Sequence, residues 1–237
     1  MRRRLIIAGA AVAVLAIVGA SIVYFAFIRT DAAPPLRLQP TVASPVPSIT
    51  LPGPWTVAAD SQAGYRIKEE FLRDRLHVEA VGRTSEVTGS LLLAERPGGG
   101  YEARDVTVTV DLTTLRSDEP ARDDKVFSEF LEPGNSGEPQ HPTATFVAPA
   151  VAVPADARDG QPFSVTTTGR LTVRGVSRDV PVTLDCQLAG GTIRVAGSIP
   201  FTFEQFGISQ LGEEFFGFVA VEPQGTIEFL IAFSKSG

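Results

Sequence analysis

The sequence predicts an all-β fold, an antiparallel β-barrel of about eight strands with one short helix, preceded by an N-terminal transmembrane helix. Three observations predict it. Apolar residues recur at every second position in many short segments after Trp55. Turn-forming residues separate these segments at spacings that suit hairpins. One stretch, residues 118–131, instead has its apolar residues at helical spacing.

The first 29 residues predict a membrane anchor. Residues 5–28 carry no charge, and this run exceeds the ~20 residues needed to cross a ~30 Å bilayer core. Three arginines at residues 2–4 precede the run and only Arg29 follows it, so the positive-inside rule places the N-terminus in the cytoplasm. A cleaved signal peptide is the alternative, although its apolar core is usually shorter. We therefore expect a single-pass membrane protein whose folded domain is extracytoplasmic.

Residues 30–54 predict a spacer between the anchor and the folded domain. Proline is dense here and almost no apolar pattern is present, which is typical of an extended, polyproline-like linker. The spacer would hold the domain of residues 55–237 away from the bilayer. Its prolines are Pro34, Pro35, Pro40, Pro45, Pro47, Pro52 and Pro54.

Strands with one apolar face are predicted throughout the domain. The apolar faces are Val106, Val108, Val110 and Leu112; Val165, Thr167, Gly169, Leu171 and Val173; Val180, Val182, Leu184 and Cys186; Ile193, Val195, Ile199, Phe201 and Phe203; and Ile227, Phe229, Ile231 and Phe233. Turn signals stand between them at residues 97–100, 174–175, 190–191 and 223–225. Because closure removes exposed strand edges, we expect a barrel. An open sandwich is the alternative.

The helical stretch has the expected start and stop signals. Asp118 is the predicted N-cap and Pro120 fits the first turn, while Pro133 and Gly134 follow the end. Its apolar face is formed by Val126, Phe127, Phe130 and Leu131. A single amphipathic helix beside a barrel is expected to cover an opening or plug one end.

The charge and the cysteine content exclude several classes of function. Removing the five arginines and one aspartate of the first 54 residues takes the formal charge from −6 to −10, so binding of nucleic acid is disfavoured. Cys186 is the only cysteine, so no intrachain disulfide can form. A metal site would have to combine Cys186 with His77 and His141. We expect no metal and no cofactor, and solvated or structural roles for both histidines.

No motif predicts catalysis, and we expect a protein that is not an enzyme. The nucleophile elbow of serine hydrolases, the phosphate-binding loop and the dinucleotide-binding fingerprint are all missing from the sequence. Glu213 and Glu214 are the one candidate acid/base pair. Adjacent residues of a strand face opposite sides, which favours a loop or surface role, so a hydrolase using this pair is kept only as a weak alternative.

Several short motifs, in order, resemble the YceI-like family of secreted bacterial lipid-binding proteins. The strongest are Gly-x-Leu-Thr-x-x-Gly-Val at residues 169–176 and Phe-Gly-Ile at residues 206–208. The others lie at residues 65–67, 87–89, 108–111, 122–123, 130–131, 141–146 and 212–214. The resemblance implies an extended, lipocalin-like barrel that encloses a polyisoprenoid or another long-chain amphiphile, with no established catalytic centre. His141 and Arg174 depart from the family pattern, where tyrosine and histidine are common.

Together with the resemblance, the many phenylalanines of the chain suggest a candidate ligand-binding site. The chain has 15 Phe against three Tyr and one Trp, which suits a dry cavity wall but suits a packed core equally well. The candidate wall residues are Phe127, Phe130, Phe146, Phe201, Phe203, Phe206, Phe215 and Phe229. Arg122 and Arg174 are candidates for a phosphate headgroup, although solvated charges are the simpler interpretation. The expected partner is an isoprenoid or acyl lipid. The alternative function is that of an envelope interaction protein with a filled barrel. A homodimer is left open.

Overall fold

The computed structural model describes residues 32–39, 51–71, 76–155, 157, 160–189, 191–208 and 219–236. Contacts divide the chain into the units Met1–Ala33 and Pro34–Gly237, and the second contains all the elements described below. The elements are β1 (Gly53–Val57), β2 (Gln62–Phe71), β3 (Leu76–Thr84), β4 (Val87–Glu95), β5 (Tyr101–Asp111), η1 (Leu112–Thr114), α2 (Pro120–Phe130), β6 (Thr143–Val153), β7 (Pro162–Val173), β8 (Val176–Ala189), β9 (Thr192–Thr202), η2 (Glu204–Phe206) and β10 (Val219–Lys235).

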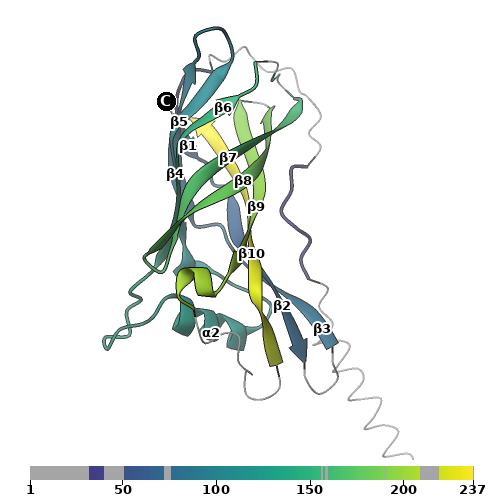
Figure 1. Ribbon diagram of the computed structural model, residues 1–237, viewed down its shortest axis with the longest axis vertical. Coiled ribbons are helices and arrows are strands. Elements are labelled where there is room, and N and C mark those ends of the chain that lie inside the picture. The colour runs from purple at the N-terminus through teal and green to yellow at the C-terminus, as the bar shows by residue number, and fades with distance from the viewer. Residues whose placement is uncertain are drawn as a thin grey trace, which may run out of the picture. The chain divides into compact units, whose positions relative to one another are not determined.

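Eight antiparallel strands close into a ring in the order β1-β4-β5-β6-β7-β8-β9-β10, with β10 returning to β1 (Figure 1). Trp55 and Val57 of β1 pair with Lys235 and Phe233 of β10 to complete the closure. The hairpin of β2 and β3 continues the sheet along the same side of β10, beyond β1. The predicted eight-stranded barrel is therefore confirmed, and the open sandwich is not formed.

The β7–β8 hairpin shows how local sequence fixes the register. Val173 pairs with Val176 across a two-residue turn of Arg174 and Gly175, and both turn residues have positive φ angles of 50° and 70°. Two positive φ angles are the mark of a type I′ turn, whose twist matches that of the flanking strands. The register set by this turn directs Gly169 and Leu171 inward, where both are buried.

Residues 223–225 do not form a turn between strands, contrary to the sequence prediction. They lie inside β10, where the register with β2 shifts between Val221 and Gly225. Proline cannot donate to a ladder and glycine weakens a strand, so both mark bulges as readily as turns. The bulge allows one long strand to pair with β9 and β2 instead of ending at Pro223.

The seam between β6 and β7 is short. The two strands pair only through Thr145, Phe146 and Val147 on β6, whereas β7 and β8 pair over all of Pro162–Val173. Beyond Val147 the two strands of the seam are not paired with each other in the described residues. The barrel wall is therefore parted along this section of the β6–β7 seam, and, among the residues described, β8 and β9 are likewise paired only over Leu184–Ala189 and Thr192–Gly197.

Helix α2 lies at one end of the barrel (Figure 1). The helix was predicted over residues 118–131 and is observed over Pro120–Phe130, but its N-cap is Glu119 and not Asp118. The Glu119 carboxylate accepts a hydrogen bond from the Ala121 N–H, while Asp118 pairs with Arg122 one turn later. Val126 and Leu131 are buried and anchor the helix against the barrel end.

A buried charge network fastens an extended segment to the outside of the barrel. Glu228 of β10 points away from the interior yet is only 3% exposed. Its carboxylate accepts from Arg83 at 2.6 Å, from Arg66 at 3.3 Å and from the Leu36 N–H at 3.3 Å. Residues 34–39, which the sequence assigns to a free spacer, therefore contact the barrel wall through Leu36.

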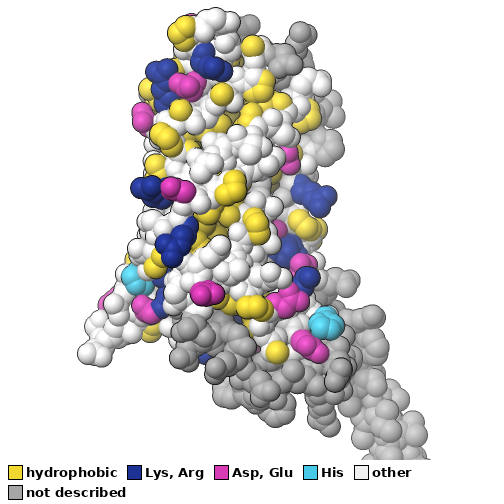
Figure 2. All heavy atoms as spheres, in the orientation of Figure 1, with side chains coloured by type: hydrophobic (Ala, Val, Ile, Leu, Met, Phe, Trp, Pro, Cys, Tyr) yellow, Lys and Arg dark blue, Asp and Glu magenta, His cyan; other side chains and the backbone are white. Residues whose placement is uncertain are grey.

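The remaining outer surface is a mixture of both charges. On the face drawn in Figure 2, basic and acidic side chains lie near one another and no large patch of one sign forms. Arg170 and Asp179, and Arg194 and Asp60, are exposed pairs of this kind at 2.9 Å.

The predicted membrane anchor lies outside the described residues. Within the part of the chain that the structure describes, no helix is both long and apolar enough to cross a bilayer.

Candidate ligand-binding cavity

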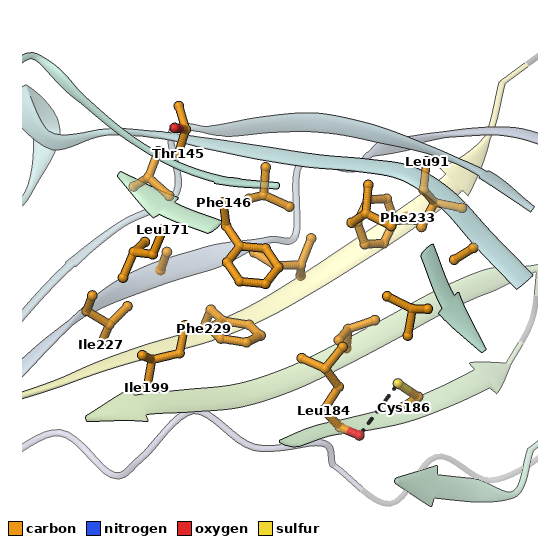
Figure 3. Close-up of a pocket in the computed structure, with 18 of the residues that line it drawn as sticks. Leu91, Thr145, Phe146, Leu171, Leu184, Cys186, Ile199, Ile227, Phe229 and Phe233 are labelled. Atoms are coloured by element: carbon orange, nitrogen blue, oxygen red, sulfur yellow. Dashed lines mark hydrogen bonds between the residues drawn. The ribbon is translucent and has the colours of Figure 1, made fainter. Parts of the chain in front are cut away.

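A cavity of about 230 Å³ occupies the interior of the barrel. Its wall is built from the inward side chains of the strands, so the alternation that defines each strand also defines the wall. On β10 the wall residues are Ile227, Phe229, Ile231 and Phe233, and on β5 they are Val106, Val108 and Val110. Figure 3 shows Phe229 of β10 and Phe146 of β6 pointing into the same space.

The cavity is long. It follows β10 from Ile227 to Phe233, and six steps at ~3.4 Å per residue correspond to about 20 Å of strand. One end is bordered by Leu112, Leu115 and Val126, next to helix α2. The other is bordered by Tyr101 and Val153, together with Leu51 and Ala157. The wall also includes Val151, Phe163 and Val165, which flank the parted section of the β6–β7 seam.

The wall is almost wholly apolar. Of the wall side chains in the described residues, only Tyr65, Tyr101, Thr145 and Cys186 carry a polar atom. The Cys186 thiol is buried, and this burial raises its pKa to about 12, with a smaller contribution from the charge of Asp185. A thiol that stays protonated is a poor nucleophile. The cavity can therefore hold an apolar molecule but offers little chemistry.

Two aromatic rings of the wall lie over glycines of neighbouring strands. A Cβ atom on Gly169 would come 2.1 Å from Cζ of Phe146, and one on Gly197 would come 2.6 Å from Cζ of Phe229. Both glycines leave room that any larger residue would fill. Phe146 and Phe229 point toward one another near the middle of the cavity in Figure 3, and each packs against both of the hydrophobic clusters inside the barrel.

Four of the eight phenylalanines predicted for the wall line the cavity. These are Phe146, Phe201, Phe206 and Phe229. Phe203 is buried but sits behind the wall, with its ring centre 5.7 Å from that of Phe201. The Phe130 side chain and the whole of Phe215 lie outside the described residues.

Phe127, which the sequence predicts in the wall, lies away from the cavity in the structure. It is 37% exposed and does not line the cavity. The helical spacing placed Val126 and Phe127 on one face, but adjacent helical residues are about 100° apart. Tertiary packing turns Val126 inward, so Phe127 falls on the flank of the helix.

Arg122 faces carboxylates of its own chain. Its Nε and Nη2 donate to the two Glu69 oxygens at 2.9 and 3.0 Å, and Nη1 donates to Asp118 at 2.5 Å. Burial disfavours the charged guanidinium, but the bonds and charges of Glu69 and Asp118 outweigh this effect and raise its pKa. Arg122 therefore ties α2 to β2, and it does not line the cavity.

Arg174 joins three segments near the helix-covered end. Its guanidinium pairs with the Glu132 carboxylate and donates to the Gly207 carbonyl, and the same carboxylate lies 3.4 Å from Nε2 of His141. The arginine links the β7–β8 turn to the loop after α2 and to the end of η2. It does not line the cavity either, and the headgroup roles of both arginines stay untested.

The other candidates of the sequence are placed as follows. His77 is an exposed residue of β3, and the described residues hold no group of three or more potential metal-ligating side chains. Glu213 and Glu214 lie outside the described residues.

Sequence reasoning missed the aliphatic part of the wall. Leu91, Leu93 and Ala103 line the cavity together with Leu188. The signal was available, because these residues occupy alternate positions in strands. The predicted wall contains only phenylalanines, so these aliphatic residues are not part of it.

The fold and the cavity define a class of protein, a closed antiparallel barrel around an elongated apolar cavity. The chain belongs to the YceI-like domain family, whose family model matches residues 55–233. No curated protein sequence matches the chain significantly.

Solved structures with a similar fold include a polyisoprenoid-binding domain from Saccharophagus degradans, implicated in plant cell wall breakdown. It has 15% sequence identity and a TM-score of 0.56, over 77% of this chain and 98% of that one. Burkholderia cenocepacia BcnA has 19% identity and a TM-score of 0.46, over 71% and 95%. A Campylobacter jejuni YceI protein has 14% identity and a TM-score of 0.45, over 65% and 85%. The Saccharophagus structure supports the fold.

Proposed function

We propose that the barrel binds one slender apolar chain, an isoprenoid or a long acyl chain, and carries it without chemical change. The observation that carries the proposal is the long apolar cavity inside a closed ring of strands. A packed core would leave no such space, because protein interiors rarely contain voids larger than a water molecule. The Saccharophagus domain is described as polyisoprenoid-binding, and we extend that ligand class to this chain.

The dimensions favour a chain over a compact ligand. The cavity of about 230 Å³ exceeds the ~150 Å³ of an engineered apolar cavity that binds benzene, but is smaller than the ~300–1,000 Å³ of pockets for drug-sized molecules. The cavity extends for about 20 Å along β10, so its shape suits an extended chain of methylenes. A longer ligand would be accommodated by rotamer changes of wall residues such as Phe146 and Phe229.

Burial of the apolar chain of the ligand supplies enough free energy for binding. At ~0.8 kcal/mol per methylene, a 16-carbon chain gains about 13 kcal/mol gross. Association costs about 4–15 kcal/mol, so the two terms are of the same size and micromolar binding needs no enzyme-like site. We accordingly propose a carrier and no catalytic role.

The filled-barrel alternative does not fit the structure. An interaction protein acting only through its loops would have a packed interior, and the cavity contradicts that part of the hypothesis.

We also propose that the barrel is extracytoplasmic and tethered to the cell membrane. The uncharged run at residues 5–28, flanked by arginines at residues 2–4, supports this topology. Fusion of a periplasmic reporter enzyme after residue 237 should give activity, and a cytoplasmic reporter at the same position should not. The opposite pattern would overturn the topology.

The binding proposal is tested by native mass spectrometry of the chain purified from its host. We expect an added mass that organic extraction recovers as an isoprenoid or acyl compound. Ala144→Phe places a ring in the cavity wall and should abolish the added mass. Val147→Phe, an exposed position on the same strand β6, is the matched control and should keep it.

Two outcomes would count against the carrier. One is a clean apo mass together with no uptake of prenyl or acyl probes. The other is retention of the lipid in Ala144→Phe, which would place the ligand outside the barrel. Circular dichroism of both variants shows whether the barrel is still folded.

A further inference from the structure

Tyr65 brings a polar group to one end of the apolar cavity. It belongs to β2, is 7% exposed and lines the wall near helix α2. Its ring lies over Gly82 of β3, where a Cβ atom would come 2.4 Å from Cε1 of the ring. Gly82 is the register partner of Tyr65, so the glycine gives the ring its place and fixes the position of the hydroxyl.

The Tyr65 hydroxyl is buried and has no hydrogen-bond partner among the described residues. The hydroxyl of Ser117, which acts on the pKa of Tyr65, already donates to the Glu119 carbonyl and accepts from Arg122 and from the Glu119 N–H. Buried polar groups nearly always have a partner, and an unmade hydrogen bond at a buried site costs free energy. An unpartnered hydroxyl at the end of a binding cavity is therefore suited to a group that the ligand brings.

The surroundings keep this hydroxyl protonated. Burial raises the pKa of Tyr65 above its ordinary value, and the charges of Asp123 and Glu69 add to this effect. Together they outweigh the lowering of the pKa by Arg122 and by the Ser117 side chain. A neutral phenol offers one O–H donor. The group that satisfies it must be an acceptor.

The same surroundings disfavour an anionic acceptor. The guanidinium that acts on the hydroxyl, that of Arg122, is bound by Glu69 and Asp118. Asp123 adds a further carboxylate, which accepts from the Ser117 N–H at 2.9 Å. Acidic groups outnumber basic ones around the hydroxyl, so a phosphate or carboxylate would meet like charge. A ketone, ester or ether oxygen meets no such penalty.

We propose that Tyr65 binds the polar end of the ligand by donating its O–H to a neutral oxygen acceptor, with the apolar chain running from α2 toward Tyr101. This inference rests on the proposed function and adds a ligand class and an orientation to it. Apolar chains that end in a neutral carbonyl or ether are selected over plain hydrocarbons and over chains that end in phosphate or carboxylate.

The test compares four probes with the same chain length: 2-hexadecanone, hexadecane, hexadecanoate and hexadecyl phosphate. Each displaces a neutral fluorescent probe, N-phenyl-1-naphthylamine, from the full chain in detergent-free buffer. Wild type should bind the ketone about five- to tenfold more tightly than hexadecane, the range expected for one net hydrogen bond. Tyr65→Phe should lose that difference and keep the affinity for hexadecane.

Tyr101→Phe is the matched control, because it removes a hydroxyl from the wall at the other end of the cavity. It should leave the ketone preference unchanged. The infrared carbonyl band of bound 2-hexadecanone gives an independent readout, since hydrogen bonding lowers its frequency. The band should shift to higher frequency in Tyr65→Phe and not in Tyr101→Phe, and thermal melts of both variants should match wild type.

The outcomes separate this inference from the proposed function. If no probe binds wild type, the carrier fails and the Tyr65 role fails with it. If all probes bind but Tyr65→Phe changes neither the ketone preference nor the carbonyl band, the carrier stands and the Tyr65 role is overturned. Tightest binding of hexadecyl phosphate, lost in Arg122→Gln, would overturn the neutral-acceptor class, and loss of the ketone preference in Tyr101→Phe would reverse the orientation.

Discussion

The ring of Phe146 rests on the bare backbone of Gly169: a Cβ atom on the glycine would lie 2.1 Å from Cζ of the ring. Because Phe146 lines the cavity, we expect a ring displaced from Gly169 to move into that space. Gly169→Ala should therefore drive the ring inward, lower the affinity for apolar probes at least about tenfold, and cost about 1–3 kcal/mol of overpacking strain. Probe displacement and urea unfolding measure the two effects.

Gly134→Ala is the control for this substitution. A Cβ atom there meets nothing closer than 3.8 Å, and the residue is not among those with positive φ. It should change neither affinity nor stability appreciably. Unaltered binding in Gly169→Ala would show that Phe146 moves away from the cavity instead.

Cys186 should make stability fall at alkaline pH. Burial raises the pKa of its thiol from 9.0 to about 12 in the folded chain, so the unfolded chain loses this proton first. The stabilisation is complete below pH 9 and declines by about 1.4 kcal/mol per pH unit above it. Urea unfolding of wild type and Cys186→Ala at pH 8, 9 and 10 measures the decline, with reductant present. Identical pH slopes for the two proteins would contradict the buried thiol.

Glu228 should be essential for stability although it lies on the outer side of β10. Glu228→Gln leaves Arg83 without its carboxylate partner at 2.6 Å, and breaking a buried pair typically costs about 3–5 kcal/mol. It should also release the Leu36 N–H, which amide exchange detects. Asp179→Asn breaks the exposed pair with Arg170 and is the control. If both variants lose the same small amount of unfolding free energy, the Glu228 network stabilises the fold no more than an exposed ion pair does.

Replacing Phe229 by alanine should change both stability and ligand binding, whereas replacing Phe127 by alanine should leave ligand binding unchanged. Phe229→Ala enlarges the cavity at its middle and should cost about 3 kcal/mol, the lower end of the usual range for such a truncation, while raising the affinity for branched prenyl chains over straight ones. Phe127→Ala should leave binding unchanged, because this ring is 37% exposed and off the wall. Calorimetry with matched prenyl and alkyl probes checks both expectations, and a binding defect in Phe127→Ala would place the ligand against α2.

Alternation was enough to predict the strands and much of the wall. In β10 the residues Ile227, Phe229 and Phe233 were assigned to one face, and all three line the cavity. Residues 223–225 were misassigned because a proline and a glycine carry the same local signal in a turn and in a bulge. Pairing with β2 and β9 decides between the two, and that pairing is not visible in a local window.

The polar part of the site lay beyond sequence reasoning for the same reason. Arg122 meets Glu69, 53 residues away in sequence, so its charge could not be known to be compensated. In the sequence, Tyr65 is marked only as part of the motif at residues 65–67, and its unpartnered hydroxyl depends on burial that the fold creates. The side of α2 that faces the barrel, which separates Val126 from Phe127, is likewise set by packing.

The short seam between β6 and β7 has a kinetic consequence. Local opening of a protein costs least where few backbone hydrogen bonds must break, and these strands are joined only at Thr145, Phe146 and Val147. The side chains that flank the parted section, Val151 and Val165 among them, also line the cavity. Guest exchange should therefore follow the breathing of this seam and stay fast under conditions in which the molecule as a whole almost never unfolds.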